Sequence, residues 1–147
     1  MAIRIAEKKD FEAIKKLVKA HAKFEKAGTL SNNSLNRLSN YIFNIDVVEC
    51  LVVELNDEIV GYATFMKQFS TWNANYYIYL DCLFLNEQTR GKGIGTQIMD
   101  SIKIYAKSIN CSEIQWQTPD FNKKAIDFYN KIGGKSKSKE RFCLNIW

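Results

Sequence analysis

The spacing of apolar residues in the first third of the chain predicts one strand followed by two helices. Residues 3–5 alternate apolar and polar side chains, as a short strand does. Asp10 stands where a helix cap is expected, and the helix after it should end near Gly28. Its apolar stripe consists of Phe11, Ile14, Leu17, Val18 and Phe24. Residues 34–44 carry the same helical spacing and predict the second helix.

The middle of the chain is rich in β-branched and aromatic residues and predicts three strands. Residues 50–55 and 59–69 flank the polar turn 56–58, which is the pattern of a hairpin. Residues 76–85 predict a further strand, antiparallel to the second strand of the hairpin. Because this strand is apolar on both faces, we expect it in a central, buried position of a sheet.

The last third of the chain predicts a long helix, a strand, a short helix and a final strand. The glycine-rich run 90–95 opens the long helix, which should extend to about Ser108. Residues 114–117 predict a strand that ends before Pro119. Residues 122–131 predict the short helix, ended by a pair of glycines, and residues 141–147 predict the final strand. The order indicates a mixed α/β fold with a strand, a glycine turn and a helix at its centre.

Length and composition favour one domain over residues 1–147. The chain has 147 residues, of which 46% are hydrophobic, and a single proline. Four widely separated cysteines and one histidine do not have the spacing of a metal site, so we expect no metal. The first residues lack the apolar run of a signal peptide, and no segment has the length of a membrane span. We therefore expect a cytoplasmic protein with reduced thiols and no membrane partner.

The net charge of +5 favours an anionic ligand. This ligand could be nucleic acid, an acidic surface or a phosphorylated cofactor. Basic residues cluster only at 135–139, and no nucleic-acid-binding motif accompanies them. We therefore expect no nucleic-acid partner.

The glycine turn has the chemistry of a pyrophosphate-binding site. A strand that leads into a glycine-rich turn and a helix directs backbone N–H groups and the positive end of the helix dipole to one point. The pattern GxxxxGK[ST] is absent, and the pattern GxGxxG fails at Thr96. The pattern that remains is [Arg/Gln]-x-x-Gly-x-[Gly/Ala], which Arg90, Gly93 and Gly95 satisfy. The alternative is a helix start whose glycines only allow close packing.

Three segments together resemble the GNAT superfamily of N-acetyltransferases. They are the strand 79–85, the glycine turn, and the run 122–133, which is similar to the superfamily's N-x-x-A-x-x-F-Y-x-x-x-G segment. The resemblance covers nearly the whole chain. It implies an α/β (α+β) fold, with a mixed, mostly antiparallel central sheet of about six or seven strands flanked by about four helices. It also implies acetyl-CoA as co-substrate.

The same resemblance assigns residues to acetyl-CoA. Main-chain groups of Leu83, Phe84 and Leu85 would bind the pantetheine arm, because a splayed strand leaves them unpaired. The turn would hold the pyrophosphate, and the short helix would contact the cofactor from another side. The residues implied for the turn and the helix are Arg90, Gly91, Lys92, Gly93, Ile94, Gly95, Thr96, Asn122, Ala125 and Tyr129.

Two residues are candidates for proton transfer in acyl transfer to an amine. Tyr129 matches the family's tyrosine general acid, and a phenol of pKa ~10 can protonate a leaving thiolate. Asp81 is the candidate base, because an acid in an apolar strand costs stability unless it is paired or functional. The alternatives are that Tyr129 only packs beside Phe128 and that Asp81 only caps or forms a salt bridge.

Two further residues are weaker candidates for chemistry. A lone histidine near a core stripe, such as His21, is more often structural. Cys82 could carry an acyl group, but a buried cysteine usually acts as a small hydrophobe. We therefore expect direct transfer within a ternary complex.

Within the superfamily, the chain looks most like the spermidine/spermine (diamine) acetyltransferases, through residues 17–25, 60–65 and 79–81. This resemblance implies a homodimer and an acceptor site. The implied acceptor residues are Phe24, Glu25, Asp81, Gln115, Trp116 and Gln117. The chain departs from that family at Cys82, where a second acid tends to follow the acid at the position of Asp81. The loss of one carboxylate weakens the electrostatic attraction of a polycation.

We therefore expect a small primary amine, such as a diamine, a polyamine or a lysine-like amino acid. An aminoglycoside or a protein or peptide amine is the alternative. Two alternatives belong to other functional classes. One is a CoA-binding module without catalysis, and the other is an unrelated nucleic-acid-binding domain.

Overall fold

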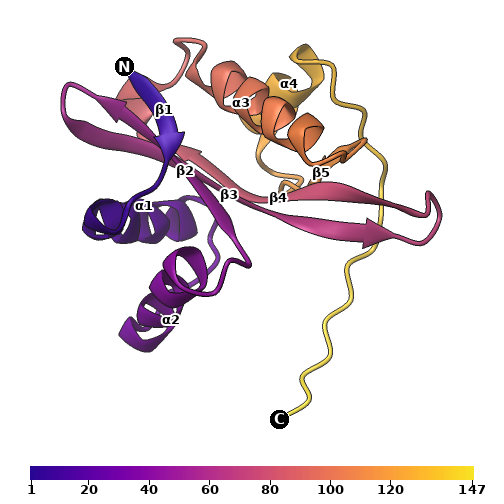
Figure 1. Cartoon of the computed structure of the whole chain (residues 1–147), viewed down its shortest axis with the longest axis horizontal. Coiled ribbons are helices and arrows are strands. Elements are labelled where there is room, and N and C mark those ends of the chain that lie inside the picture. Colours follow the sequence, from indigo (N-terminus) through magenta and orange to yellow (C-terminus); the bar gives the residue numbers. More distant parts are fainter. The chain divides into compact units, whose positions relative to one another are not determined.

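Five strands form one sheet in the first of two units of the chain. The computed structural model describes residues 1–147, and the two units are Met1–Gln117 and Thr118–Trp147. The strand order is β1-β2-β3-β4-β5, with antiparallel pairing except between β4 and β5, which are parallel (Figure 1). The strands are β1 (Ala2–Ile5), β2 (Glu49–Leu55), β3 (Glu58–Ser70), β4 (Asn75–Leu85) and β5 (Ile114–Trp116).

The β2–β3 hairpin forms where the sequence predicts it. Its turn residues Asn56 and Asp57 have φ of 51° and 63°, a left-handed conformation that Asn and Asp tolerate better than other non-glycine residues. β4 is antiparallel to β3, as predicted, and it lies between β3 and β5. β3 and β4 are longer than their other neighbours, so residues 68–70 and 75–77 pair only with each other and project as a two-stranded ribbon (Figure 1).

Helices cover both faces of this sheet (Figure 1). α1 (Phe11–Phe24) and α2 (Asn32–Phe43) lie on one side, and α3 (Ile94–Ser108) lies on the other. Two short 3₁₀ helices precede α1 and α3, at Lys8–Asp10 and Glu87–Thr89. The apolar stripe of α3 faces inward. Its buried residues are Ile94, Ile98, Met99, Ile102 and Ala106. None of the helices has the length and apolar character that crossing a bilayer requires.

The second unit contains one helix, α4 (Lys123–Lys131). Asn122 caps it, because its side-chain oxygen accepts a hydrogen bond from the Ala125 N–H at 3.3 Å. The strand predicted at residues 141–147 is wrong, since this segment has no helix or strand and its apolar side chains are exposed. The sheet accordingly has five strands where six or seven were expected. Alternating side chains define two faces for a segment, but a strand also needs a partner for its backbone groups.

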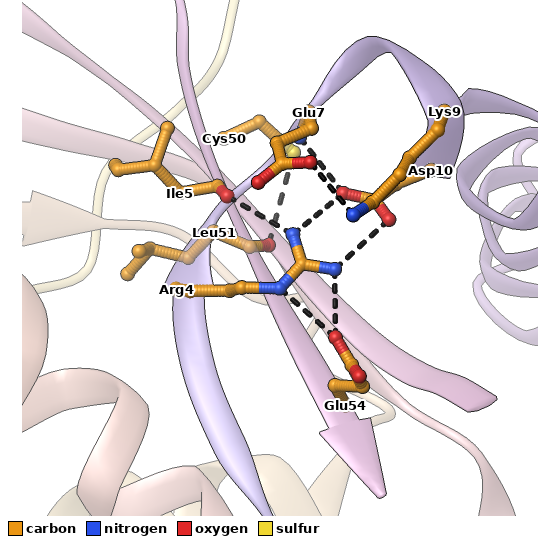
Figure 2. Close-up of polar contacts among 8 residues, drawn as sticks. All are labelled: Arg4, Ile5, Glu7, Lys9, Asp10, Cys50, Leu51 and Glu54. Atoms are coloured by element: carbon orange, nitrogen blue, oxygen red, sulfur yellow. Dashed lines mark hydrogen bonds and ion pairs between the residues drawn. The ribbon is translucent and has the colours of Figure 1, made fainter. Parts of the chain in front are cut away.

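An ionic cluster joins β1, β2 and the start of α1, and it corrects the expectation for Asp10 (Figure 2). Asp10 stands at the cap position of α1, but its carboxylate makes no cap bond to that helix. It accepts hydrogen bonds from Arg4 Nη1 and Nη2, at 2.7 and 3.0 Å, and from the Glu7 N–H at 2.8 Å. The Arg4 guanidinium also donates to Glu54 Oε2 at 2.7 Å. The hydrogen bonds from Arg4 hold the pKa of Asp10 below its ordinary value despite burial.

Replacing Asp10 tests how much this cluster stabilises the fold. Asp10→Asn leaves Arg4 partly buried with one of its two anions removed, and we expect the free energy of unfolding at pH 7 to fall by about 2 kcal/mol. Because the folded-state pKa is lowered, the ionised carboxylate stabilises the fold above its unfolded pKa of ~3.9, and this contribution disappears as the pH falls through the lower folded pKa. Urea denaturation at pH 7 and at pH 2 should show a larger difference between wild type and variant at pH 7 than at pH 2.

Glu12→Gln is the matched control. Glu12 pairs with Lys15 at 2.7 Å, but its side chain is 78% exposed. Its removal should change stability by less than about 0.5 kcal/mol. Equal effects of the two substitutions would contradict the importance of the buried cluster.

Candidate active site

Asp81 lies at a β-bulge in β4. Thr64 pairs with Cys82 and Phe65 with Leu80, so Asp81 is the extra residue between them. Its side chain is exposed, and no salt bridge holds it. Its Oδ2 accepts from the Cys82 thiol at 3.7 Å. The bulge therefore turns an acid of an apolar strand outward, where its carboxylate is available, and neither a cap nor a salt bridge accounts for it.

β4 has an unpaired backbone edge directly after Asp81. On one side, Leu83, Phe84 and Leu85 pair with β3. On the other side, the parallel ladder with β5 ends at the pair Leu80–Trp116. The β5 ladder therefore does not reach residues 83–85, and their assignment to the pantetheine arm stays a prediction. The N–H and C=O groups that point away from β3 are free of a strand partner and can bind an extended ligand.

The glycine turn that follows has the backbone conformation that glycine allows. Gly91 and Gly93 both have φ of 75°, in the left-handed region that L side chains rarely adopt, and Gly93 is the N-cap of α3. No side chain caps α3, and its first turn holds no acidic residue. The first N–H groups of an α-helix have no partner within the helix, so this turn is open to an anion. Gly95 already belongs to α3 and needs no positive φ.

Arg90 connects this turn to α1 and β4. Its Nε donates to the carbonyl oxygen of Leu85 at 2.9 Å. The guanidinium carbon lies 4.7 Å from the ring centre of Phe24 and 5.2 Å from that of Phe84, within the range of cation–π attraction. The side chain of Arg90 thus lies among aromatic rings, and its assignment to acetyl-CoA stays a prediction.

The predicted acceptor residues of α1 and β4 lie near one another in the first unit. The ring of Phe24 is 6.3 Å from that of Phe84. Glu25, just after α1, accepts from His21 Nε2 at 3.1 Å. The His21 ring is buried and stacks on Phe84, with centroids 5.0 Å apart. The end of α1 therefore packs against Phe84, three residues after Asp81 on β4.

The predicted residues of β5 lie on the other side of β4. Gln115 pairs with Tyr79 and Trp116 with Leu80. Gln115 and Gln117 are exposed, and the amide of Gln115 donates to Glu113 Oε1 at 2.7 Å. Their assignment to the acceptor stays a prediction.

The predicted residues of the short helix belong to the second unit. Asn122 caps α4, as described above, and Ala125 receives that cap. Tyr129 lies on α4, with its ring 5.2 Å from the ring of Phe128. The contact fits the packing alternative for Tyr129, and its catalytic role stays a prediction.

Three polar residues beneath Asp81 form contacts that the sequence did not predict. His21 Nδ1 lies 2.9 Å from Tyr62 Oη, and the Cys82 thiol donates to Asp81 Oδ2 at 3.7 Å. Burial, and then the nearby Asp81 carboxylate, raise the pKa of Cys82 to about 11, so its thiol is neutral at physiological pH and a poor nucleophile. A tyrosine in an apolar strand was the available signal, because a buried phenol usually finds a hydrogen-bond partner.

Comparisons with known proteins agree on one family. A family model described as "Acetyltransferase (GNAT) family" matches residues 7–134. The thialysine N-epsilon-acetyltransferases of Mus musculus and Bos taurus are 30% and 29% identical to this chain. The first alignment covers 98% of this chain and 89% of the mouse protein, and the second covers 90% of this chain and 83% of the bovine protein.

Solved structures share the fold. The aminoglycoside N-acetyltransferase AAC(6')-Iy, solved in complex with CoA, superposes with a TM-score of 0.85. It is 15% identical, and the alignment covers 99% of this chain and 95% of that one. The match of the family model over most of the chain, with the β4 edge and glycine turn described above, shows that this chain belongs to the GNAT family of acetyltransferases.

Proposed function

We propose that residues 1–147 form one acetyltransferase domain that transfers the acetyl group of acetyl-CoA to the primary amine of a small molecule by direct attack. The observation that carries this proposal is the free backbone edge of β4, residues 81–85, which leads into the glycine turn before α3. An extended arm ending in a pyrophosphate matches the two parts of this surface. Family membership supports acetyl-CoA as the ligand.

The chain's backbone supplies most of the binding to acetyl-CoA. Free groups of residues 83–85 would hold the pantetheine arm as an added strand holds its neighbour. The N–H groups of residues 91–96 would bind the pyrophosphate, helped by the α3 dipole. A backbone N–H on β4 beside the thioester would stabilise the oxyanion of the tetrahedral intermediate.

Asp81 and Tyr129 are the proposed proton-transfer residues. A primary amine of pKa ~10.4 is mostly protonated at pH 7, so it must lose a proton before it attacks. Asp81 is exposed on the bulge and can accept that proton, directly or through a water molecule. Tyr129 would then protonate the thiolate of CoA as it leaves.

The acceptor is proposed to be a diamine, a polyamine or a lysine-like amino acid. Two relatives are named for acetylating the ε-nitrogen of thialysine, and both align over at least 90% of this chain. Glu25 and Asp81 offer negative charge on a molecule whose net charge is +5. Phe24, Gln115, Trp116 and Gln117 are the other proposed acceptor contacts.

The cellular setting completes the proposal. We place the enzyme in the cytoplasm, where its four free cysteines would stay reduced. The resemblance to diamine acetyltransferases supports a homodimer.

Release of CoA thiol, followed across a panel of amines, tests this function. We expect turnover with thialysine, lysine, diamines or polyamines, and little with aminoglycosides or peptides. Tyr129→Phe should lower kcat by about 100-fold or more if the hydroxyl is the general acid. Tyr41→Phe, which alters an exposed tyrosine of α2, is the control and should keep wild-type rates. Turnover of aminoglycosides or peptides alone would replace the small-amine proposal, and CoA binding without turnover of any amine would indicate a CoA-binding module.

A matched pair of glycine substitutions tests the pyrophosphate turn. Gly93→Ala and Gly28→Ala each force an L residue into positive φ, at 75° and 87°, and in both cases the added methyl group meets open space. Each should therefore cost about 1–2 kcal/mol of stability. Only Gly93→Ala should weaken CoA binding measured by isothermal titration calorimetry, because the strain acts on the N–H groups of the turn. Equal affinities in the two folded variants would place the pyrophosphate elsewhere.

A further inference from the structure

The end of α1 carries a carboxylate that a buried histidine holds in place. Glu25 is the C-cap of α1, and its backbone N–H donates to the His21 carbonyl oxygen at 2.9 Å. Its side chain turns back to the same residue, so that Glu25 Oε1 lies 3.1 Å from His21 Nε2. His21 is 7% exposed, whereas the Glu25 side chain is 31% exposed. The carboxylate is thus anchored from the interior and still reaches the surface.

His21 is itself held by two aromatic residues of the sheet. Tyr62 on β3 and Phe84 on β4 are cross-strand partners, so their side chains lie on the same face. The His21 ring stacks on Phe84, with centroids 5.0 Å apart and planes at 22°, and its Nδ1 lies 2.9 Å from Tyr62 Oη. Tyr62 is 2% exposed. The imidazole therefore has a contact on one face and a partner at each nitrogen, which fixes the orientation of the ring.

The chemistry of the two outer groups determines the direction of both hydrogen bonds. An ionised carboxylate only accepts, so the bond to Glu25 requires a proton on His21 Nε2. In a neutral imidazole Nδ1 is then an acceptor, and the Tyr62 hydroxyl donates to it. Burial raises the pKa of Tyr62, so the phenol keeps the proton that it donates. Tyr62 thereby selects the tautomer whose N–H points to Glu25.

We propose that the buried pair His21–Tyr62 positions the Glu25 carboxylate to bind a second ammonium group of the acceptor, and so favours acceptors with two amines over monoamines. This inference rests on the proposed function, in which Glu25 belongs to the acceptor site. His21 and Tyr62 act through Glu25 and are positioning residues. They hold the carboxylate in one geometry before the acceptor arrives, which lowers the entropy cost of binding.

The surroundings of Glu25 show why its position matters. A partly exposed glutamate without such an anchor would sample several rotamers. Phe24, the residue before it, is 43% exposed, and its ring can pack against the carbon chain between two amines. The Arg90 guanidinium lies 4.7 Å from the centre of that ring and repels an approaching cation. A fixed anion at Glu25 offsets this repulsion at the same end of α1.

Steady-state kinetics with matched amines test the proposal. Putrescine and butylamine share the same carbon chain, as do lysine and aminohexanoate, and in each pair only the first has a second amine. Tyr62→Phe removes only the hydroxyl that selects the tautomer. For whichever diamine or lysine acceptor the enzyme acetylates, we expect about a 5-fold higher KM with kcat almost unchanged. The kcat/KM for the matched monoamine should stay at the wild-type value. Equal losses for both members of a pair would overturn the proposal.

A double-mutant cycle separates positioning from a purely structural role. Glu25→Gln removes the negative charge and should raise the KM for the same acceptor by about 10-fold. In the Glu25→Gln background, Tyr62→Phe should add no further increase, because no carboxylate is left to position. An equal effect of Tyr62→Phe in both backgrounds would overturn the proposal, since the two residues would then act independently.

Tyr105→Phe is the matched control for these rates. It removes a tyrosine hydroxyl that donates to Glu49 at 3.0 Å, away from Glu25 and His21. Its KM for each amine should match that of the wild type. A rise like that of Tyr62→Phe would overturn the proposal, because losing any tyrosine hydrogen bond would then have the same effect.

The single histidine allows a test that needs no turnover. Long-range ¹H–¹⁵N NMR reports on His21 alone, because the chain has one histidine. We expect the neutral ring to carry its proton on Nε2. In the presence of CoA, putrescine or lysine should shift the Nε2 resonance, because an ammonium at Glu25 changes the charge that faces this N–H. The matched monoamines should leave the resonance unchanged.

These experiments distinguish failure of the positioning from failure of the proposed function. A neutral ring protonated on Nδ1, or acetylation of putrescine or lysine without a shift of Nε2, would overturn the positioning of Glu25 and leave the acetyltransferase function intact. A shift of Nε2 that needs the second amine, in a chain that acetylates no amine, would support the ammonium site at Glu25 and reject the proposed function instead.

Discussion

The two-sided pairing of β4 is the constraint on which the rest of the site depends. β4 is held by β3 along its length, but β5 pairs with only three of its residues. A polypeptide edge left without a ladder partner must find water or a ligand, because its N–H and C=O groups are costly to leave unpaired. The point where the β5 ladder ends is next to the bulge, so the free edge and the outward carboxylate of Asp81 arise from the same local irregularity.

On its other side, the end of β4 packs closely against β3. A Cβ on Gly61 would lie 2.4 Å from Leu85 Cδ2 and 2.9 Å from the Phe84 carbonyl oxygen, so glycine allows the two strands to approach closely here. Arg90, which follows β4 in the chain, donates a hydrogen bond to the carbonyl oxygen of Leu85. The end of β4 and the glycine turn after it are thereby held together, and a ligand that spans both would meet a preformed surface.

Aromatic contacts join α1 to this surface. Phe84 is in contact with the rings of His21 and Phe24 and with the guanidinium of Arg90. Any movement of the end of α1 would therefore disturb the contacts of Phe84 and Arg90. The buried side chains of His21 and Tyr62 are partners of each other, which is what allows polar groups to lie in an apolar core at acceptable cost.

The sequence by itself determined the order of elements, the hairpin, the central place of β4 and the glycine turn. These features follow from local rules: apolar periodicity, turn residues and the backbone freedom of Gly91 and Gly93. Asp81 was recognisable because an acid interrupts an apolar strand. The tertiary structure alone decided that Asp81 is a bulge residue, that Asp10 binds Arg4 and does not cap α1, and that residues 141–147 have no strand partner. It also decided that His21 meets Tyr62, 41 residues later in the chain. Pairing partners and contacts between distant segments depend on the packing of the whole sheet. The local spacing of apolar and polar residues does not determine that packing.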